Sequence, residues 1–322
     1  MAAIEAADLR RTYKTHTGTV RRRSKEIEAV RGISFAVEPG ELFGLLGPNG
    51  AGKTTTIKML ITLLIPTGGS ARVLGLDVVR DAHEVRRRIG YVFGGERGVY
   101  ERLSGYDNLR YFAELYGVPA REQKRRIEEL LDLVGLKGRE HERAEGYSRG
   151  MKQRLHVARG LLHDPEVLFL DEPTIGLDPV GAREVRSTIA SLTAAGKTVL
   201  LTTHYMFEAD ALCDRIAVIT QGSIVAEGTP LDLKRGVAEV SVLEIEVFGI
   251  ADGSTERVRE LEGVVAVAVE ERDQAQVLVV QTRPEVELTQ AILAHLEGAD
   301  VGRISRRDPT LEDAYVALVT TE

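Results

Sequence analysis

The stretch GPNGAGKT, residues 47 to 54, constrains the fold more than any other part of the sequence, because it requires a strand before it and a helix after it. The apolar run 42–46 predicts that strand, and the pattern over 53–64 predicts the helix. Glycines in such a loop let backbone N–H groups turn inward toward phosphate oxygens, and the helix N-terminus adds a favourable dipole. The predicted phosphate loop consists of Gly47, Pro48, Asn49, Gly50, Ala51, Gly52, Lys53, Thr54 and Thr55.

A second motif, VLFLDE at residues 167 to 172, is an apolar strand that ends in two carboxylates. Acids at the end of a buried strand are costly unless they are paired or lie near a metal. With Lys53 reaching the β- and γ-phosphates and Thr54 ligating Mg²⁺, we expect Asp171 to hold that ion through its water shell. Glu172 is then placed to orient or deprotonate the attacking water. The two motifs predict a nucleoside triphosphatase, without specifying which kind.

The composition of the chain limits the classes of protein to which it can belong. Helical and strand-like runs alternate along the chain and 43% of the residues are apolar, which indicates an α/β fold. The formal net charge of −7 gives no global attraction to nucleic acid or anionic lipid. Cys213 is the single cysteine, so a disulfide framework and a cysteine zinc site are excluded. The sequence lacks a run of 18 apolar residues and a signal-peptide pattern, so we expect a soluble, cytoplasmic chain.

The pattern along the chain predicts two domains. Residues 1–37 read as an antiparallel hairpin interrupted by a basic insert at 14–25, and further strands are expected near 89–93, 166–171, 198–203, 214–220 and 223–228. Residues from about 105 to 163 are wholly helical and predict an inserted helical subdomain. From about 240 the order β-α-β-β-α-β predicts a small ferredoxin-like α+β domain. The predicted boundaries are 1–236 for the nucleotide-binding domain and 240–322 for an accessory domain of dimerisation or regulation.

YSRGMKQRL, residues 147 to 155, narrows the family. At this point the chain resembles the ATP-binding subunits of ABC transporters, in particular the daunorubicin- and multidrug-resistance exporter branch. The usual signature is Leu-Ser-Gly-Gly-Gln; here Ser148 and Gly150 match, whereas Tyr147, Arg149 and Met151 differ. The resemblance implies that this turn contacts the γ-phosphate held by the opposite subunit, so that ATP lies between two head-to-tail copies. The implied cofactors are ATP and Mg²⁺.

The resemblance also implies roles for three further residues. GLDP, residues 176 to 179, resembles the D-loop, in which Asp178 connects the two sites of the dimer. His204 follows the strand TVLLTT as the family's switch histidine does, and contacts the γ-phosphate or the attacking water. Tyr13 resembles the aromatic residue that stacks on adenine. The closing segment DPTLEDAY, residues 308 to 315, resembles one common in the same branch, and we expect it to have a packing or dimer-stabilising role.

The glycine-rich stretch VFGGERGVY, residues 92 to 100, departs from the family pattern. The glutamine that helps to ligate Mg²⁺ in the family has Gly94 at its position here, and Glu96 is the nearest candidate replacement as a metal ligand. Because no Lys-Ser/Thr pair follows these glycines, we favour a modified coupling loop over a second phosphate cradle. Its glycines would then give mobility between the ATP site and the partner-facing helices.

The function implied is an ATP-hydrolysing subunit that energises export of a hydrophobic drug-like or lipid substrate. We expect a homodimer that works with a separate integral membrane subunit, peripheral on the inner face of the cell membrane, with no nucleic acid partner. The alternative is a soluble ABC ATPase that acts on a ribosome or a nucleic acid. An unrelated P-loop kinase or GTPase is opposed by the signature and D-loop spacing. The basic insert is interpreted as a solvated hairpin tip, with contact to the inner leaflet or a partner as the alternative.

Overall fold

The computed structural model describes residues 1–17, 23–94, 98–235, 241–250, 253–272, 275–283, 288–296, 299–307 and 309–320. It divides into two compact units, Met1–Glu227 and Gly228–Glu322. The tip of the basic insert, residues 18–22, lies outside the described residues. No helix in the described ranges is both long enough and apolar enough to cross a membrane.

A six-stranded sheet forms the centre of the first unit, in the order β10-β9-β3-β8-β7-β6. Its strands are β3 (Leu42–Leu46), β6 (Ile89–Phe93), β7 (Val167–Asp171), β8 (Thr198–Thr203), β9 (Arg215–Thr220) and β10 (Ser223–Gly228). Neighbours from β9 through β3, β8 and β7 to β6 are parallel. Strands covered on both faces need apolar residues at nearly every position, and β3, β7 and β8 are buried throughout. The predicted α/β core is confirmed.

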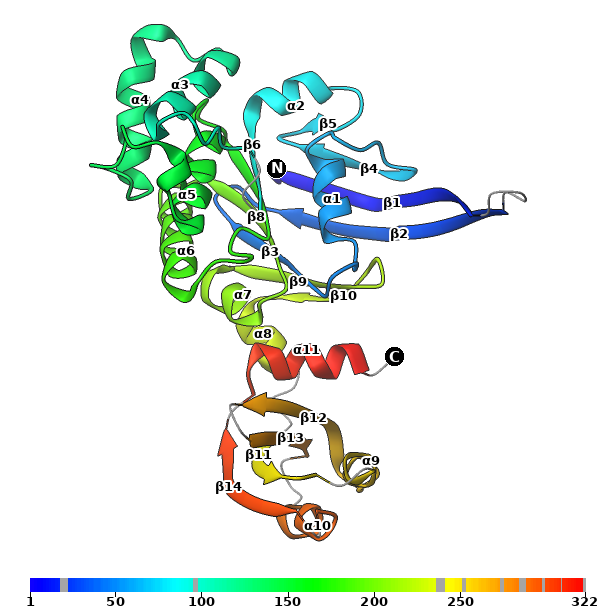
Figure 1. Cartoon of the computed structure of the whole chain (residues 1–322). Helices are drawn as coiled ribbons and strands as arrows, with labels where there is room; N and C mark the ends of the chain where they lie inside the picture. The colour runs from blue at the N-terminus through cyan, green and yellow to red at the C-terminus, as the bar shows by residue number, and fades with distance from the viewer. Residues whose placement is uncertain are drawn as a thin grey trace. The chain divides into compact units, whose positions relative to one another are not determined.

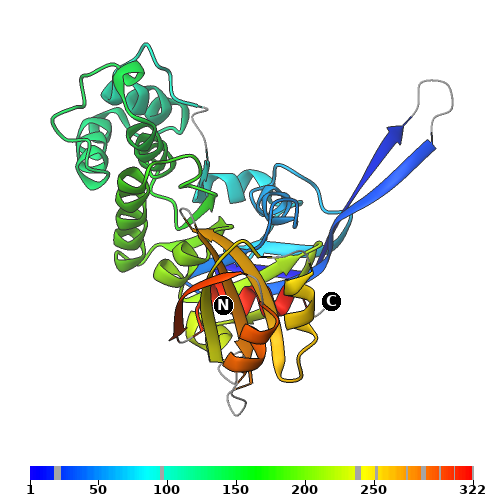
Figure 2. The ribbon, with the colours of Figure 1, turned by 60° about the horizontal axis from the view of Figure 1, so that its bottom comes forward.

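An antiparallel sheet of order β2-β1-β4-β5 packs into the same unit. It comprises β1 (Ile4–Thr17), β2 (Arg23–Val37), β4 (Gly68–Val73) and β5 (Leu76–Asp77). The predicted hairpin is confirmed, and β1 and β2 run out together as a long arm (Figure 2). Strands β4 and β5 were not predicted from the sequence, although Ala71 and Val73 point into the core with the period of a strand.

Helices connect and cover these sheets. The first unit contains α1 (Lys53–Leu60), α2 (Ala82–Arg88), α6 (Pro179–Ala194) and α7 (Met206–Leu212). The predicted helical segment consists of α3 (Gly105–Leu115), α4 (Ala120–Leu133), a short 3-10 turn at Ala144–Gly146 and α5 (Arg149–Gly160). These helices gather away from the β1–β2 arm (Figure 1). Tyr147 is buried among them, and its hydroxyl donates to the Arg139 carbonyl oxygen at 2.7 Å, which fixes the turn that leads into α5.

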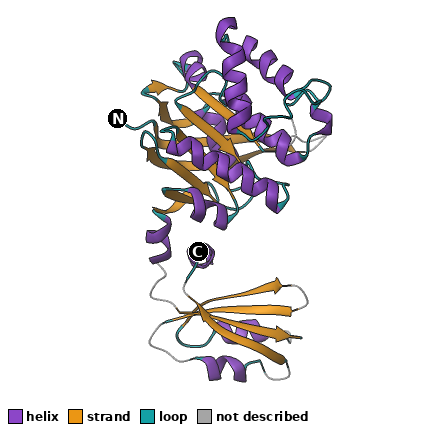
Figure 3. Cartoon of the chain, turned by 90° about the vertical axis from the view of Figure 1, so that its left-hand side faces the viewer, coloured by secondary structure: helices purple, strands orange, loops and turns teal. Residues whose placement is uncertain are grey.

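The second unit has the predicted ferredoxin-like order, and its strands are arranged β12-β13-β11-β14. Figure 3 shows the sheet of this unit in orange and its helices in purple. Its elements are α8 (Pro230–Arg235), β11 (Ser241–Phe248), α9 (Ser254–Arg259), β12 (Val264–Arg272), β13 (Ala275–Thr282), α10 (Thr289–Ala294), β14 (Asp300–Arg307) and α11 (Leu311–Thr320). Residues from α9 and α10 join one face of the sheet in an apolar core. Residues 228–235 group with this unit rather than with the first one, because α8 packs against α11.

The closing segment DPTLEDAY starts α11 with a capping interaction. The Thr310 backbone N–H donates to Asp313 at 2.7 Å, and the Asp313 backbone N–H donates to the Thr310 hydroxyl at 3.3 Å. Arg307 forms an ion pair with Asp313 and another, at 2.8 Å, with Glu244 of β11. These contacts tie α11 to the sheet of its own unit, as a packing role requires.

Candidate functional site

The phosphate loop joins β3 to α1, and its glycines are required by geometry. Gly50 and Gly52 have φ angles of +84° and +109°, which other residues rarely adopt. A Cβ on Gly47 would lie 2.1 Å from the Ile219 carbonyl oxygen, so this position has no room for a side chain. Pro48, Asn49 and Gly50 are exposed, Ala51 is buried, and Thr54 and Thr55 are half-buried in the first turn of α1. The loop therefore has the backbone freedom that wrapping around a phosphate needs.

Lys53 lies under this loop and is only 4% exposed. Its Nζ donates to the carbonyl oxygens of Gly47 at 2.7 Å and Pro48 at 3.1 Å. It also forms an ion pair with Glu172 Oε1 at 3.2 Å. The ammonium is therefore held at the loop by three oxygen atoms, at the point where a triphosphate would lie against the loop.

Asp171 ends β7 beside the first turn of α1. Its Oδ1 accepts from the Thr54 hydroxyl at 3.1 Å and from the Thr202 hydroxyl of β8 at 2.5 Å. Within the described residues, no group of three or more His, Cys, Asp or Glu side chains is arranged so that it could hold a metal ion by itself. A hydroxyl and a carboxylate fit Mg²⁺, which prefers oxygen ligands and takes the rest from water and substrate phosphates.

Glu172 follows directly and has a φ of +49°, a left-handed conformation for a non-glycine residue that costs about 1–3 kcal/mol. Its backbone N–H donates to the Thr202 carbonyl oxygen at 3.0 Å, which holds the bend. The carboxylate reaches Lys53 with one oxygen and His204 Nδ1 with the other, the latter at 3.1 Å. The His204 ring also lies against the Tyr205 ring, with centroids 4.1 Å apart. The bend thus directs Glu172 toward the loop.

The structure brings together the predicted residues Lys53, Thr54, Asp171, Glu172 and His204. Thr202, which contacts both Asp171 and Glu172, was not among the residues predicted from the sequence. A threonine at the buried end of an apolar strand was the available signal, because a polar side chain there needs a partner.

The predicted signature turn lies at the start of α5. Ser148 is the N-cap, with its hydroxyl accepting from the Met151 N–H at 3.2 Å, and Ser148 and Arg149 are exposed. Asp178 caps α6 in the same way through the Gly181 N–H at 3.2 Å. The two helices approach closely here, since a Cβ on Gly150 would lie 3.1 Å from Gly181 Cα. Signature and D-loop residues therefore form one packed surface with exposed helix caps.

Tyr13 lies on β1, half-buried, with the Arg11 guanidinium carbon 4.8 Å from its ring centroid. Its partner on β2 is Ile27. Two residues further along β2, the Ala29 carbonyl oxygen would lie 2.5 Å from a Cβ on Gly52. Tyr13 therefore lies on the same pair of strands, β1 and β2, that contacts the phosphate loop.

Gly94 follows β6 and lies against the two acids. Its N–H donates to the Asp171 carbonyl oxygen at 2.7 Å. A Cβ at this position would lie 2.2 Å from the Glu172 carbonyl oxygen and 2.8 Å from Ile175 Cγ2. A glutamine therefore cannot be accommodated at position 94 without moving the backbone. Glu96, predicted as a metal ligand, lies outside the described residues, as do residues 95 and 97.

Gly94→Ala is expected to reduce ATP hydrolysis by at least about tenfold, because the added methyl group pushes on the backbone of Glu172 and small displacements of a catalytic group are costly. Steady-state phosphate release measures this effect. Gly146→Ala provides the control for a glycine substitution, since a Cβ there meets no atom within 4 Å and the backbone is not in the left-handed region. A Gly94→Ala rate equal to that of the wild type would show that the contact has no effect on the site.

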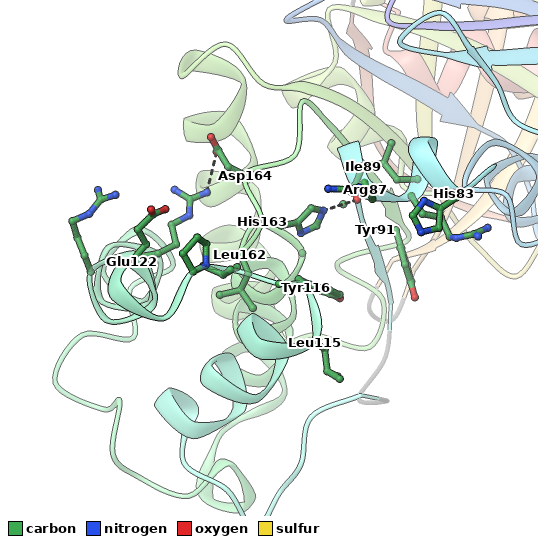
Figure 4. A pocket seen from close by; sticks show the side chains of 18 residues that line it. His83, Arg87, Ile89, Tyr91, Leu115, Tyr116, Glu122, Leu162, His163 and Asp164 are labelled. Atoms are coloured by element: carbon green, nitrogen blue, oxygen red, sulfur yellow. Dashed lines mark hydrogen bonds and ion pairs between the residues drawn. The ribbon is translucent and has the colours of Figure 1, made fainter. Parts of the chain in front are cut away.

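A separate cleft of about 550 Å³ lies in the first unit (Figure 4). It is lined by α2, β6, the α3–α4 connection, α4 and the residues after α5. Its exposed apolar groups are Tyr91, Leu115 and Tyr116, at 39%, 62% and 40% exposure. His163 donates to the Ile89 carbonyl oxygen at 2.9 Å within it, and burial lowers the pKa of that histidine. The cleft thus combines exposed rings with a basic rim from α2 and α4, formed by Arg86, Arg87 and Arg125.

Comparison with known proteins places this geometry in a family. The family model described as ABC transporter matches residues 30–175. The chain is 43% identical to the ABC transporter ATP-binding protein NatA of Bacillus subtilis, over 64% of this chain and 84% of the relative. It is 39% identical to the daunorubicin resistance ATP-binding protein DrrA3 of Streptomyces coeruleorubidus, over 90% of this chain and 91% of the relative.

A solved structure has the same fold. It is a dimeric ATP-binding cassette in a post-hydrolysis state, bound to ADP and phosphate. The match has a TM-score of 0.61 and 24% identity, and covers 70% of this chain and 98% of the other. With the phosphate loop, the strand-end acids and relatives of this similarity, the chain belongs to the ATP-binding, ATP-hydrolysing proteins of the ABC transporter family.

Proposed function

We propose that this chain is the ATP-hydrolysing subunit of an exporter for a hydrophobic drug-like or lipid substrate, which crosses the membrane through a separate integral subunit. The observation that carries the proposal is the convergence of Lys53 and His204 on the Glu172 carboxylate, beside the pair formed by Thr54 and Asp171. Similarity to a daunorubicin resistance protein supports export of a hydrophobic substrate.

In the proposed reaction, the backbone N–H groups of residues 49–52 and the Lys53 ammonium bind the triphosphate, and Tyr13 stacks on adenine. Glu172 takes a proton from the attacking water, while the water oxygen bonds to the γ-phosphorus. The bond from that phosphorus to the bridging oxygen breaks, which releases ADP and phosphate. His204 holds the Glu172 carboxylate and contacts the γ-phosphate or the water. Thr54 and, through water, Asp171 would hold Mg²⁺, which would supply positive charge against the phosphates; Glu96 is a proposed additional ligand.

The proposed site is completed by a second copy of the chain. Ser148, Arg149, Gly150 and Met151 form a helix start that suits an anion held by another molecule, with Ser148 and Arg149 exposed at its end. Asp178, on the adjacent helix cap, connects the two sites. Binding of two Mg·ATP then favours the closed dimer, and loss of phosphate favours its opening, which is a shift of population driven by differential affinity.

The proposed place for the membrane subunit is the cleft of Figure 4, because its exposed tyrosines and leucine, on β6 and at the end of α3, lie outside the nucleotide site. The chain would then be peripheral on the inner face of the membrane. Residues 92–100 would join this surface to the ATP site, since Gly94 contacts Asp171 directly.

Leu115→Arg is expected to weaken co-purification with the proposed membrane subunit by about tenfold, while ATP binding stays unchanged, because a charge replaces an exposed apolar anchor. Leu133→Arg is the matched control, an exposed leucine at the far end of α4. Drug or lipid export by the reconstituted wild-type pair measures the function itself. Association of the wild-type chain with ribosomes or DNA instead of the membrane protein would contradict the proposal.

A further inference from the structure

Glu208 is a buried acid for which the proposed reaction has no role. It lies in the first turn of α7 and is 1% exposed. Within the described residues, neither of its carboxyl oxygens has a partner in hydrogen-bond geometry. Burying a carboxyl group without hydrogen-bond partners destabilises the fold, so a buried acid here calls for a physical explanation.

Two buried hydroxyls lie beside this carboxyl, those of Thr203 and Thr174. Thr174 Oγ1 is itself without a hydrogen-bond partner among the described residues. Burial has the largest influence on the pKa of Glu208 and raises it. Both hydroxyls and the charges of Arg186 and His204 act to lower this pKa, but their effects are smaller than that of burial. A protonated carboxyl has one O–H donor and an acceptor oxygen, which matches two hydroxyl groups that can each donate and accept.

The two threonines belong to the two segments that carry the reacting groups. Thr203 precedes His204, and its carbonyl oxygen accepts from the Gly47 N–H of the phosphate loop at 3.3 Å. Thr174 lies two residues after Glu172, in the chain that leads to Asp178 and the start of α6. The Glu208 carboxyl thus lies between the strand end that carries the histidine and the turn that follows the glutamate.

We propose that Glu208 is a positioning residue of the ATPase site, which bridges Thr174 and Thr203 and thereby fixes His204 against Glu172. The geometry that it maintains is the 3.1 Å contact between His204 Nδ1 and Glu172 Oε2. Glu208 acts through these neighbours and does not touch the nucleotide. The inference rests on the proposed function, because it concerns the same reaction.

The test compares Glu208→Ala with Glu208→Gln in the full-length chain, by phosphate release and ATP binding. Alanine removes the bridge, so turnover is expected to fall about tenfold or more while the ATP dissociation constant stays within about twofold. Glutamine keeps a donor and an acceptor at the same length, so it is expected to retain turnover within about threefold. Asp210→Ala, in the same helix, is the control for disturbance of α7.

A double-mutant cycle with Thr174→Val separates positioning from general stability. If the two side chains act together, the second substitution has little further effect on turnover once the first is present. The inference would be overturned by any of three results. These are wild-type turnover in Glu208→Ala, turnover in Glu208→Gln as slow as in Glu208→Ala, and independent effects of the two substitutions in the cycle. A wild-type chain that does not hydrolyse ATP would contradict the proposed function itself, and this inference with it.

Discussion

Glu172→Gln is expected to bind ATP and to hydrolyse it at least about a hundredfold more slowly than the wild type. The amide has the size of the carboxylate but cannot accept the proton of the attacking water. It also removes the negative charge beside Lys53, 3.2 Å from its Nζ, so ATP binding is not expected to weaken. Phosphate release measures the rate, and gel filtration with Mg·ATP measures the expected accumulation of closed dimers.

Glu166→Gln is the matched control for this variant, because Glu166 is an exposed glutamate just before the opposite end of the same strand. Its rate is expected to equal that of the wild type. Turnover near the normal value in Glu172→Gln would assign proton transfer to another group.

Lys53→Ala is expected to weaken ATP binding by at least about a hundredfold and to abolish hydrolysis with it. The ammonium is 4% exposed and held at the phosphate loop, so that no other described side chain can take its place there. Its loss also removes the Lys53 ion pair of the Glu172 carboxylate, so that His204 is the partner of Glu172 that remains. Isothermal titration with ATP measures the affinity, and a thermal melt separates lost binding from lost folding.

Lys58→Ala is the control in the same helix, because Lys58 is exposed. Wild-type affinity is expected for this variant. If Lys53→Ala bound ATP as tightly as Lys58→Ala, the loop of residues 47–55 would not be the nucleotide site.

The sequence predicted the core of the fold because the signals there are local. Continuous apolar runs at β3, β7 and β8 have no alternative to burial, and the loop glycines are set by their own backbone angles. By contrast, β4 is a short strand that contains two glycines and has only Ala71 and Val73 buried, so its pattern is weak. Its place in the sheet depends on pairing with β1, which is distant in sequence.

The site residues that could be predicted are those whose role is recognisable from the sequence motif in which they lie. Thr202 and Glu208 act through side chains of other elements, and such contacts depend on which strands and helices become neighbours. The register of β7 on β8 places Asp171 beside Thr202, and nothing local to either strand fixes that register. For the same reason, the contact of Gly94 with Asp171 and Glu172 could not be read from the glycine-rich stretch itself.

Mixing two inactive variants tests the central claim most directly, namely that this chain hydrolyses ATP at a site completed by a second copy. Lys53→Ala lacks a working phosphate loop but keeps its signature turn, whereas Ser148→Arg blocks that turn and keeps the loop. Each alone is expected to be inactive. An equal mixture should recover about a quarter of the wild-type rate, because half of the dimers are mixed and each has one complete site of two. An inactive mixture, or wild-type activity in Ser148→Arg alone, would contradict the account.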